Sequence, residues 1–103
     1  MFSESQLARD LATLPAVRRV YLFGSRARGD ARERSDVDIA VEAPSASPRE
    51  WLAIEEAVAA QPTLLHFDVV RFEEAPAALR DRVLEEGRLL FDRTQAGAEL
   101  PRG

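Results

Sequence analysis

Residues 24–41 decide the fold, and they read GSRARGDARERSDVDIAV. The preceding run, Val17–Phe23, is rich in β-branched and aromatic residues, which predicts a mostly buried strand. The strand is expected to end at Gly24-Ser25, and the charged segment Arg26–Ser35 is expected to form a loop. A second strand is expected over Ser35–Val41, so the stretch predicts strand, turn, loop and strand.

The second predicted strand carries carboxylates on one face. Side chains alternate along a strand, so Asp36 and Asp38 point the same way, with about 6 to 7 Å between their Cα atoms. Two like charges at that separation are costly unless a cation lies between them. A lone D-x-D is weak evidence, and solvated carboxylates at a strand end are its simplest explanation. The Gly-Ser turn ten residues earlier makes a metal site the better interpretation.

The turn before the loop has the residue types that phosphate binding needs. Gly24 allows a tight turn, with a positive φ available, and leaves room for a phosphate because it has no Cβ. Ser25 offers a hydroxyl and a backbone N–H, and the forked guanidinium groups of Arg26 and Arg28 suit phosphate oxygens. Solvated arginines paired with nearby acids are the alternative for this loop.

A third carboxylate is expected near the first two. The run Leu64–Phe72 predicts another strand, in which Asp68 is a charge among apolar residues. Three carboxylates are enough for a site with two divalent ions, although a buried aspartate bonded to a backbone amide is the structural alternative. His66 falls on the same predicted face, where a packed or hydrogen-bonded role is favoured over catalysis.

The rest of the chain predicts helices around a sheet. A capping spacing of Ser3 and Gln6 begins a helix that stops before Pro15. Trp51, with helical spacing to later apolar residues, is interpreted as packing in a second helix. The remaining expected elements are a Pro44–Pro48 connector, a helix from Pro76 to Gly87 with Leu79 and Val83 buried, and an edge strand at Leu89–Phe91. The paired glutamates at 55–56, 73–74 and 85–86 are interpreted as solvated.

Length and composition limit the possible functions. The chain has 103 residues, of which 46% are hydrophobic and 31% charged, so we expect one domain at residues 1–93 and a flexible tail at 94–103. No cysteine and a single histidine exclude thiol chemistry and His- or Cys-rich metal sites, leaving oxygen ligands. A net charge of -4 argues against direct nucleic-acid binding, and no apolar run is long enough to enter a membrane. The N-terminus does not read as a secretory signal, so a cytoplasmic location is expected.

Taken together, GSRARGDARERSDVDIAV resembles the signature of the minimal nucleotidyltransferase family, within the polymerase-β-like superfamily, and LHFDVVRF resembles its third-carboxylate strand. The resemblance covers Val17–Phe91. It implies a small α/β (mixed α+β) nucleotidyltransferase fold, with a three- to four-stranded mixed sheet and helices packed against it. It also implies nucleotide phosphates at Gly24 and Ser25, and two Mg²⁺ ions held by three catalytic carboxylates, Asp36, Asp38 and Asp68.

Small stand-alone members of that family are commonly antitoxins. The resemblance therefore implies transfer of AMP from ATP to a hydroxyl, tyrosine in known cases, of a partner HEPN-type ribonuclease toxin. An assembly with the toxin or with further copies of the chain is also implied. The alternative is an antitoxin that masks its toxin without catalysis. Transfer to a small molecule is a weaker hypothesis, and a DxD glycosyltransferase is disfavoured because about 100 residues are too few for a nucleotide-sugar domain.

Overall fold

The helices and strands follow one another along the chain in the predicted order. The computed structural model describes residues 2–24 and 36–94. The elements are α1 (Glu4–Ala12), β1 (Arg19–Phe23), β2 (Val37–Glu42), α3 (Pro48–Ala59), β3 (Phe67–Arg71), the short 3-10 helix η1 (Phe72–Glu74), α4 (Ala77–Glu86) and β4 (Arg88–Asp92). The four strands form one sheet in the order β3-β2-β1-β4. A small mixed α/β fold is thus confirmed.

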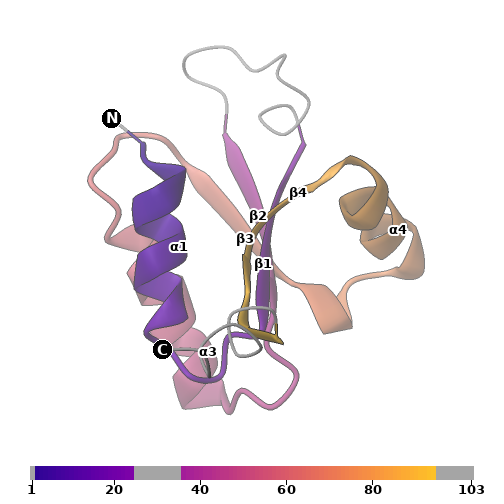
Figure 1. The fold of residues 1–103 in the computed structure, drawn as a ribbon, viewed down its shortest axis with the longest axis horizontal. Coiled ribbons are helices and arrows are strands. Elements are labelled where there is room, and N and C mark those ends of the chain that lie inside the picture. The colour runs from indigo at the N-terminus through magenta and orange to yellow at the C-terminus, as the bar shows by residue number, and fades with distance from the viewer. Residues whose placement is uncertain (1, 25–35, 95–103) are drawn as a thin grey trace, which may run out of the picture.

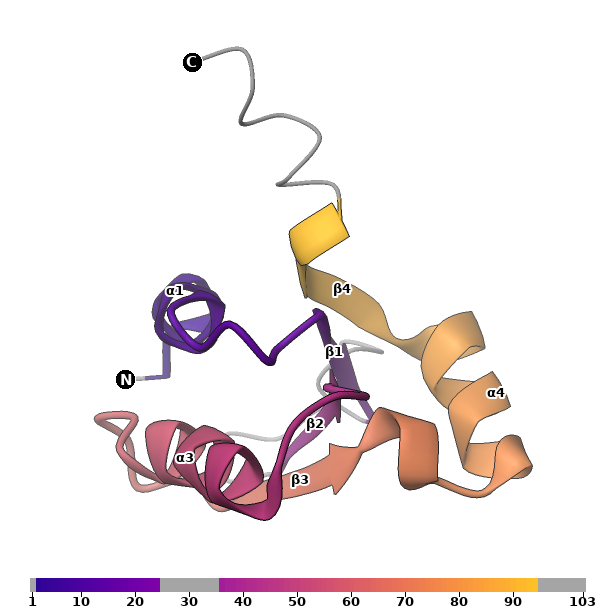
Figure 2. The same ribbon diagram turned by 90° about the horizontal axis from the view of Figure 1, so that it is seen from below.

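The sheet combines both strand directions. β1 is antiparallel to β2 and to β4, whereas β3 is parallel to β2. A parallel pair needs a long crossover, and α3 provides it between β2 and β3. Figure 1 shows α1 and α3 on one side of the sheet and α4 on the other, and the view from below in Figure 2 separates the same three layers.

Two sequence signals explain where the first helices begin. The hydroxyl of Ser3 accepts a hydrogen bond from the Gln6 N–H at 3.1 Å, as the capping spacing predicts. The second helix begins with a full capping box: the Glu50 N–H donates to the Ser47 hydroxyl, and the Glu50 carboxylate accepts from the Ser47 N–H. Pro48 occupies the first turn, where a missing N–H is harmless.

The main core lies between the sheet and the pair α1 and α3. Its fully buried side chains include Leu7, Leu11, Val20, Leu22, Val37, Ile39, Val41 and Ile54. The predicted alternation of the second strand is confirmed, because Ala40 packs on the opposite face in a smaller cluster with Phe23 and Val83 of α4. Within the described parts of the chain, no helix is long and apolar enough to cross a membrane.

The third strand is shorter than predicted. It begins at Phe67 rather than Leu64, whose side chain is fully exposed, and Phe72 already belongs to η1. The apolar pattern misled here because the segment 61–65 forms a turn, in which the Thr63 hydroxyl accepts from the Leu65 N–H. The first strand likewise begins at Arg19, since the Val17 N–H closes a turn onto the Leu14 carbonyl. The predicted loop 26–35 and the tail beyond Thr94 lie outside the described residues.

Candidate functional site

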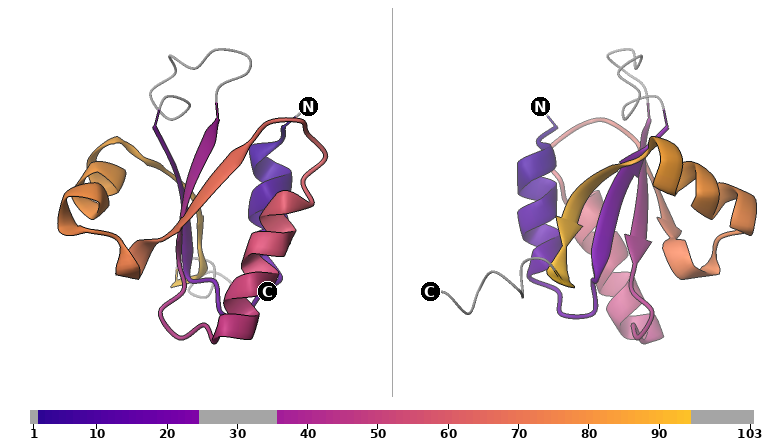
Figure 3. Two further views of the ribbon diagram at one scale, coloured as in Figure 1. Left: turned by 180° about the vertical axis from the view of Figure 1, so that it is seen from behind. Right: turned by 45° about the vertical axis from the view of Figure 1, so that its right-hand side comes forward.

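The predicted site residues that the structure describes, Gly24, Asp36, Asp38 and Asp68, lie at one end of the sheet, where β1 ends and both β2 and β3 begin. Because β2 is antiparallel to β1, its second residue, Asp38, lies opposite the last residue of β1, Phe23. The parallel register then sets Asp68 of β3 opposite Asp38. This end is at the top of Figure 1, and Figure 3 shows it from two further sides.

Gly24 follows Phe23 in a conformation that only glycine adopts easily. Its φ is +77°, and it is the only described residue with a positive φ. A Cβ built on Gly24 would also collide with a carboxylate oxygen of Asp38. The backbone of the turn therefore lies directly against the Asp38 side chain. The positive φ favours glycine, and a Cβ here would in addition force the Asp38 carboxylate to move.

Asp38 and Asp68 lie on the same face of the sheet. Residues directly opposite in a parallel pair share a face, and here it is the face that carries α4. The Asp68 side chain is 54% exposed, so the alternative of a buried aspartate bonded to a backbone amide is wrong. The His66 Nε2 lies 3.3 Å from the Asp68 Oδ1, and the His66 side chain is exposed too, so packing does not explain this histidine.

Asp36 stands just before β2 and is exposed. In the described part of the chain, no group of three or more histidine or carboxylate side chains is close enough to hold a metal ion. The facing pair nevertheless fits a divalent cation chemically, because carboxylates supply the hard oxygen ligands that such ions prefer. A site that also recruits Asp36 stays a prediction.

The remaining predicted phosphate ligands, Ser25, Arg26 and Arg28, lie outside the described residues. Gly24 is the described member of that set. Its turn is where the sequence places it, and its contact with phosphate stays a prediction.

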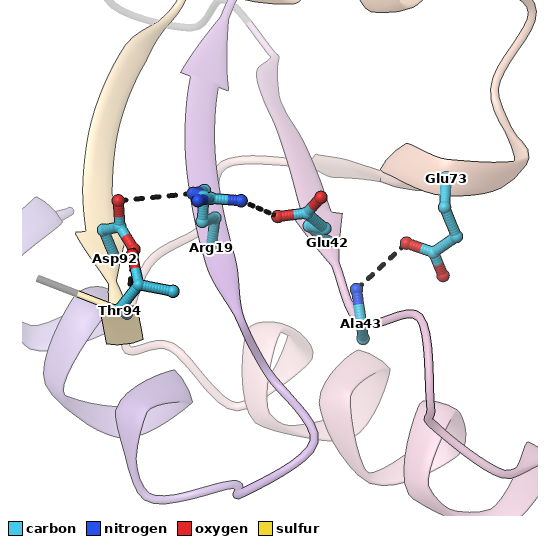
Figure 4. A network of polar contacts seen from close by, with 6 residues as sticks. All are labelled: Arg19, Glu42, Ala43, Glu73, Asp92 and Thr94. Carbon is cyan, nitrogen blue, oxygen red and sulfur yellow. Dashed lines mark hydrogen bonds and ion pairs between the residues drawn. The ribbon is translucent and has the colours of Figure 1, made fainter. Parts of the chain in front are cut away.

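The sequence did not predict a network of charged side chains at the other end of the sheet. Arg19 of β1 donates to Glu42 of β2 at 2.7 Å and to Asp92 of β4 at 3.2 Å (Figure 4). The Glu42 hydrogen bond is the main reason that the pKa of Arg19 is raised, against the opposing effect of burial. The three charges come from three neighbouring strands, and their separation in sequence hides the network.

The interpretation of Glu73 as a solvated residue is wrong. Its carboxylate accepts a hydrogen bond from the Ala43 N–H at 3.0 Å, visible in Figure 4, and pairs with the Arg71 guanidinium. Burial raises the pKa of Glu73, but the hydrogen bonds from Arg71 and Ala43 outweigh it and leave the pKa below its usual value. Glu74 is 70% exposed and lies 3.8 Å from Arg71, closer to the expected solvated role.

Comparisons with known proteins agree with this arrangement. The family described as "Polymerase beta, Nucleotidyltransferase" matches residues 5–96. A structure assigned as a minimal nucleotidyltransferase shares 30% identity, with 82% of this chain and 88% of that chain covered and a TM-score of 0.58. No curated protein matches the chain.

Two further structures similar to this chain are toxin–antitoxin complexes. One is a crystal structure of a toxin–antitoxin with AMP-PNP: 26% identity, 92% of this chain and 77% of that chain covered, and a TM-score of 0.74. The other holds a tri-AMPylated Shewanella oneidensis HEPN toxin in complex with an MNT antitoxin: 22% identity, coverages of 93% and 78%, and a TM-score of 0.59. At that identity the second likeness concerns the fold alone.

Proposed function

The chain belongs to the polymerase beta nucleotidyltransferase family, and on this premise we propose that it is a Mg²⁺-dependent antitoxin enzyme that transfers AMP from ATP to a partner toxin. The predicted resemblance to minimal nucleotidyltransferases is confirmed. One observation carries the proposal: the strand register sets Asp38 opposite Asp68, with the positive-φ turn of Gly24 against the Asp38 carboxylate. A nucleotidyltransferase needs residues that bind phosphate next to residues that bind metal, and the residues predicted for these two roles are neighbours here.

Each site residue has a role in the proposed reaction. Gly24 and Ser25 bind the phosphates of ATP, with Arg26 and Arg28 as further phosphate contacts. Asp36, Asp38 and Asp68 hold the metal, and carboxylates at a sheet end, exposed at Asp36 and Asp68 and half-buried at Asp38, are suitable for that role. When bound, two Mg²⁺ ions lower the pKa of the attacking hydroxyl and neutralise the triphosphate.

The chemistry is a single displacement at phosphorus. The acceptor oxygen forms a bond to the α-phosphorus of ATP, and the bond from that phosphorus to the bridging oxygen of pyrophosphate breaks. Asp68 accepts the proton of the acceptor hydroxyl, and pyrophosphate leaves with the electron pair of the broken bond. The half-exposed Asp68 side chain suits this role because an acceptor can approach it from solvent.

A HEPN-type ribonuclease toxin is the proposed partner, and a tyrosine hydroxyl the proposed acceptor. The complexes with AMP-PNP and with an AMPylated HEPN toxin support this choice, because one chain of each complex has a fold similar to that of this protein. The chain would work in the cytoplasm, where ATP and such a toxin meet.

The proposal predicts a HEPN-type toxin gene beside this one, and the test is the intact mass of that toxin, co-expressed with the wild-type chain or with the Asp36→Asn/Asp38→Asn variant. The proposal expects a gain of one or more AMP units with the wild type and none with the variant. A matched control, Glu55→Gln/Glu56→Gln, changes two exposed carboxylates on α3 and should modify the toxin as the wild type does. An unmodified toxin held in a tight complex with both chains would instead establish masking without catalysis.

A further inference from the structure

Arg71 is the last residue of β3, and its Nε and Nη2 groups are both engaged by neighbouring acceptors. Its Nη2 donates to the carbonyl oxygens of Ala43 at 2.7 Å and Ala46 at 2.9 Å, and its Nε pairs with the Glu73 carboxylate. The guanidinium also lies over the Trp51 ring, 5.3 Å from its centroid. Only 16% of this long side chain is exposed, which is unusual for an arginine outside an interface.

Ala43 is the residue on which these contacts converge. It directly follows β2, its carbonyl accepts from Arg71, and its N–H donates to Glu73. Both backbone polar groups of Ala43 are thus held by residues at the end of β3 or just after it. We call Arg71, Glu73 and the backbone of Ala43 the register clamp.

The register clamp acts where β3 needs it. In the described structure β3 lies at the edge of the sheet and pairs with β2 alone, over five residues. A slip by two residues would keep every side chain on its own face but would move Asp68 by about 6 to 7 Å along Asp38. Apolar packing opposes such a slip weakly, because the strand would still present the same faces. The hydrogen bonds to Ala43 oppose it directly, because a slip would separate Arg71 and Glu73 from the backbone groups of Ala43 that they contact.

We propose that the register clamp is the device that positions Asp68 opposite Asp38, and that Arg71 is a positioning residue for the metal-binding carboxylates. The inference rests on the proposed function for its metal, and on the strand pairing for its geometry. Val41 pairs with Arg71 three positions along the ladder from the carboxylate pair, so a rigid strand carries the fixed register to the site.

Arg93 provides a matched control within the same chain. Its guanidinium donates to the carbonyls of Ala12, Leu14 and Val17 at 2.8 to 3.1 Å and lies 5.0 Å from the centroid of the Phe91 ring. It therefore resembles Arg71 in donating to backbone carbonyls and lying against one aromatic ring, but it has a third carbonyl where Arg71 has the Glu73 carboxylate, and it follows β4 at the opposite edge of the sheet. Loss of Arg93 should cost stability without moving β3.

The experiment compares Arg71→Met with Arg93→Met, each of which keeps an apolar stem and removes the donors. Interstrand NOEs between β2 and β3 report the register without any metal, and amide exchange measured by NMR reports how firmly β3 is held to β2. We expect the amides of Ala43 and residues 67–71 to exchange at least about tenfold faster in Arg71→Met than in Arg93→Met. The affinity for Mn²⁺, a spectroscopic substitute for Mg²⁺, should fall about tenfold in Arg71→Met and stay within about twofold of wild type in Arg93→Met.

A milder variant, Arg71→Lys, keeps the charge but loses the fork that reaches two carbonyls and Glu73 together. It should show intermediate exchange and Mn²⁺ affinity, and it decides the matter where Arg71→Met does not fold. Equal amide exchange and equal Mn²⁺ affinity across the Arg71 and Arg93 variants would overturn the inference. Failure of the proposed function is distinguishable, because the wild type itself would then bind no Mn²⁺ while the exchange comparison would still report the clamp.

Discussion

The two ends of the sheet treat charge in opposite ways. At one end Arg19 joins Glu42 and Asp92, so three strands are linked by opposite charges. At the other end two neighbouring strands place Asp38 and Asp68, like charges, at facing positions. Like charges at facing positions weaken the pairing of two strands unless other groups balance them, and His66 lies 3.3 Å from Asp68. The first end is therefore linked by opposite charges across three strands, whereas the second end gathers carboxylates that suit the metal-binding role proposed for them.

The strongest test of this comparison removes one carboxylate of the facing pair. Asp68→Asn should lower the rate of AMP transfer by about a thousandfold, the scale of a single group that acts in a transition state. The same change should alter the free energy of unfolding by less than about 0.5 kcal/mol, because Asp68 is half-exposed and its ion pair with His66 lies at the surface. Radiolabel transfer from ATP and urea unfolding measure the two effects. A fall in both activity and stability would mean that Asp68 has a structural role instead.

The next effect concerns the turn that lies against the facing pair. Gly24→Ala should destabilise the protein by about 1 to 3 kcal/mol, since alanine is strained at a φ of +77° and its Cβ would meet the Asp38 carboxylate. Combining it with Asp38→Ala separates the two causes, because the double variant removes the collision and keeps the strain. Urea unfolding of the four chains in this cycle should show the double variant less destabilised than the sum of the two single variants. Strict additivity would mean that the contact with Asp38 carries no energy.

A smaller effect is expected at the charge-balanced end. Glu42→Gln removes one of the two acids bound to Arg19 and should cost about 0.5 to 1 kcal/mol of stability, the range of partly exposed ion pairs. It should leave AMP transfer unchanged, which makes it the counterpart of Asp68→Asn: one carboxylate becomes an amide at each end of the same sheet. Loss of transfer in folded Glu42→Gln protein would show that the two ends are not independent.

Much of this architecture is local and was therefore predictable. The Ser3 cap, the alternation of Val37, Ile39 and Val41, and the glycine turn each depend on residues close in sequence, and the structure has all three. The start of β3 was not predictable from Leu64, since its apolar side chain says nothing about whether a neighbouring strand reaches it.

Contacts between distant residues account for most of what the sequence could not predict. Glu73 finds the Ala43 N–H thirty positions away, and nothing in the pair Glu73-Glu74 distinguishes the held residue from the exposed one. A signal was available for the start of α3, where Ser47 and Glu50 have the spacing of a capping box. That Asp38 lies opposite Asp68 could not be predicted, because it depends on the parallel register of β2 and β3, which the pattern of one strand does not determine.

The smallest expected effect is a pH dependence of the free energy of unfolding, which arises from carboxyl groups away from the candidate site. The pKa of Asp92 is lowered, first by the Thr94 hydroxyl and, after an opposing effect of burial, by further hydrogen bonds that include Arg19. The pKa of Glu73 is lowered as well. A carboxyl group whose pKa is lower in the folded than in the unfolded protein stabilises the fold at pH values above the unfolded pKa, and this contribution is lost as the pH falls through the folded pKa.

The urea midpoint should therefore decline on acidification below the ordinary carboxyl range. Glu73→Gln and Asp92→Asn should each flatten that decline, with Glu55→Gln on the exposed face of α3 as the control. If neither change alters the decline of the urea midpoint but Asp68→Asn abolishes it, the acid sensitivity arises at the candidate site. The two ends of the sheet would then have the opposite of the expected roles.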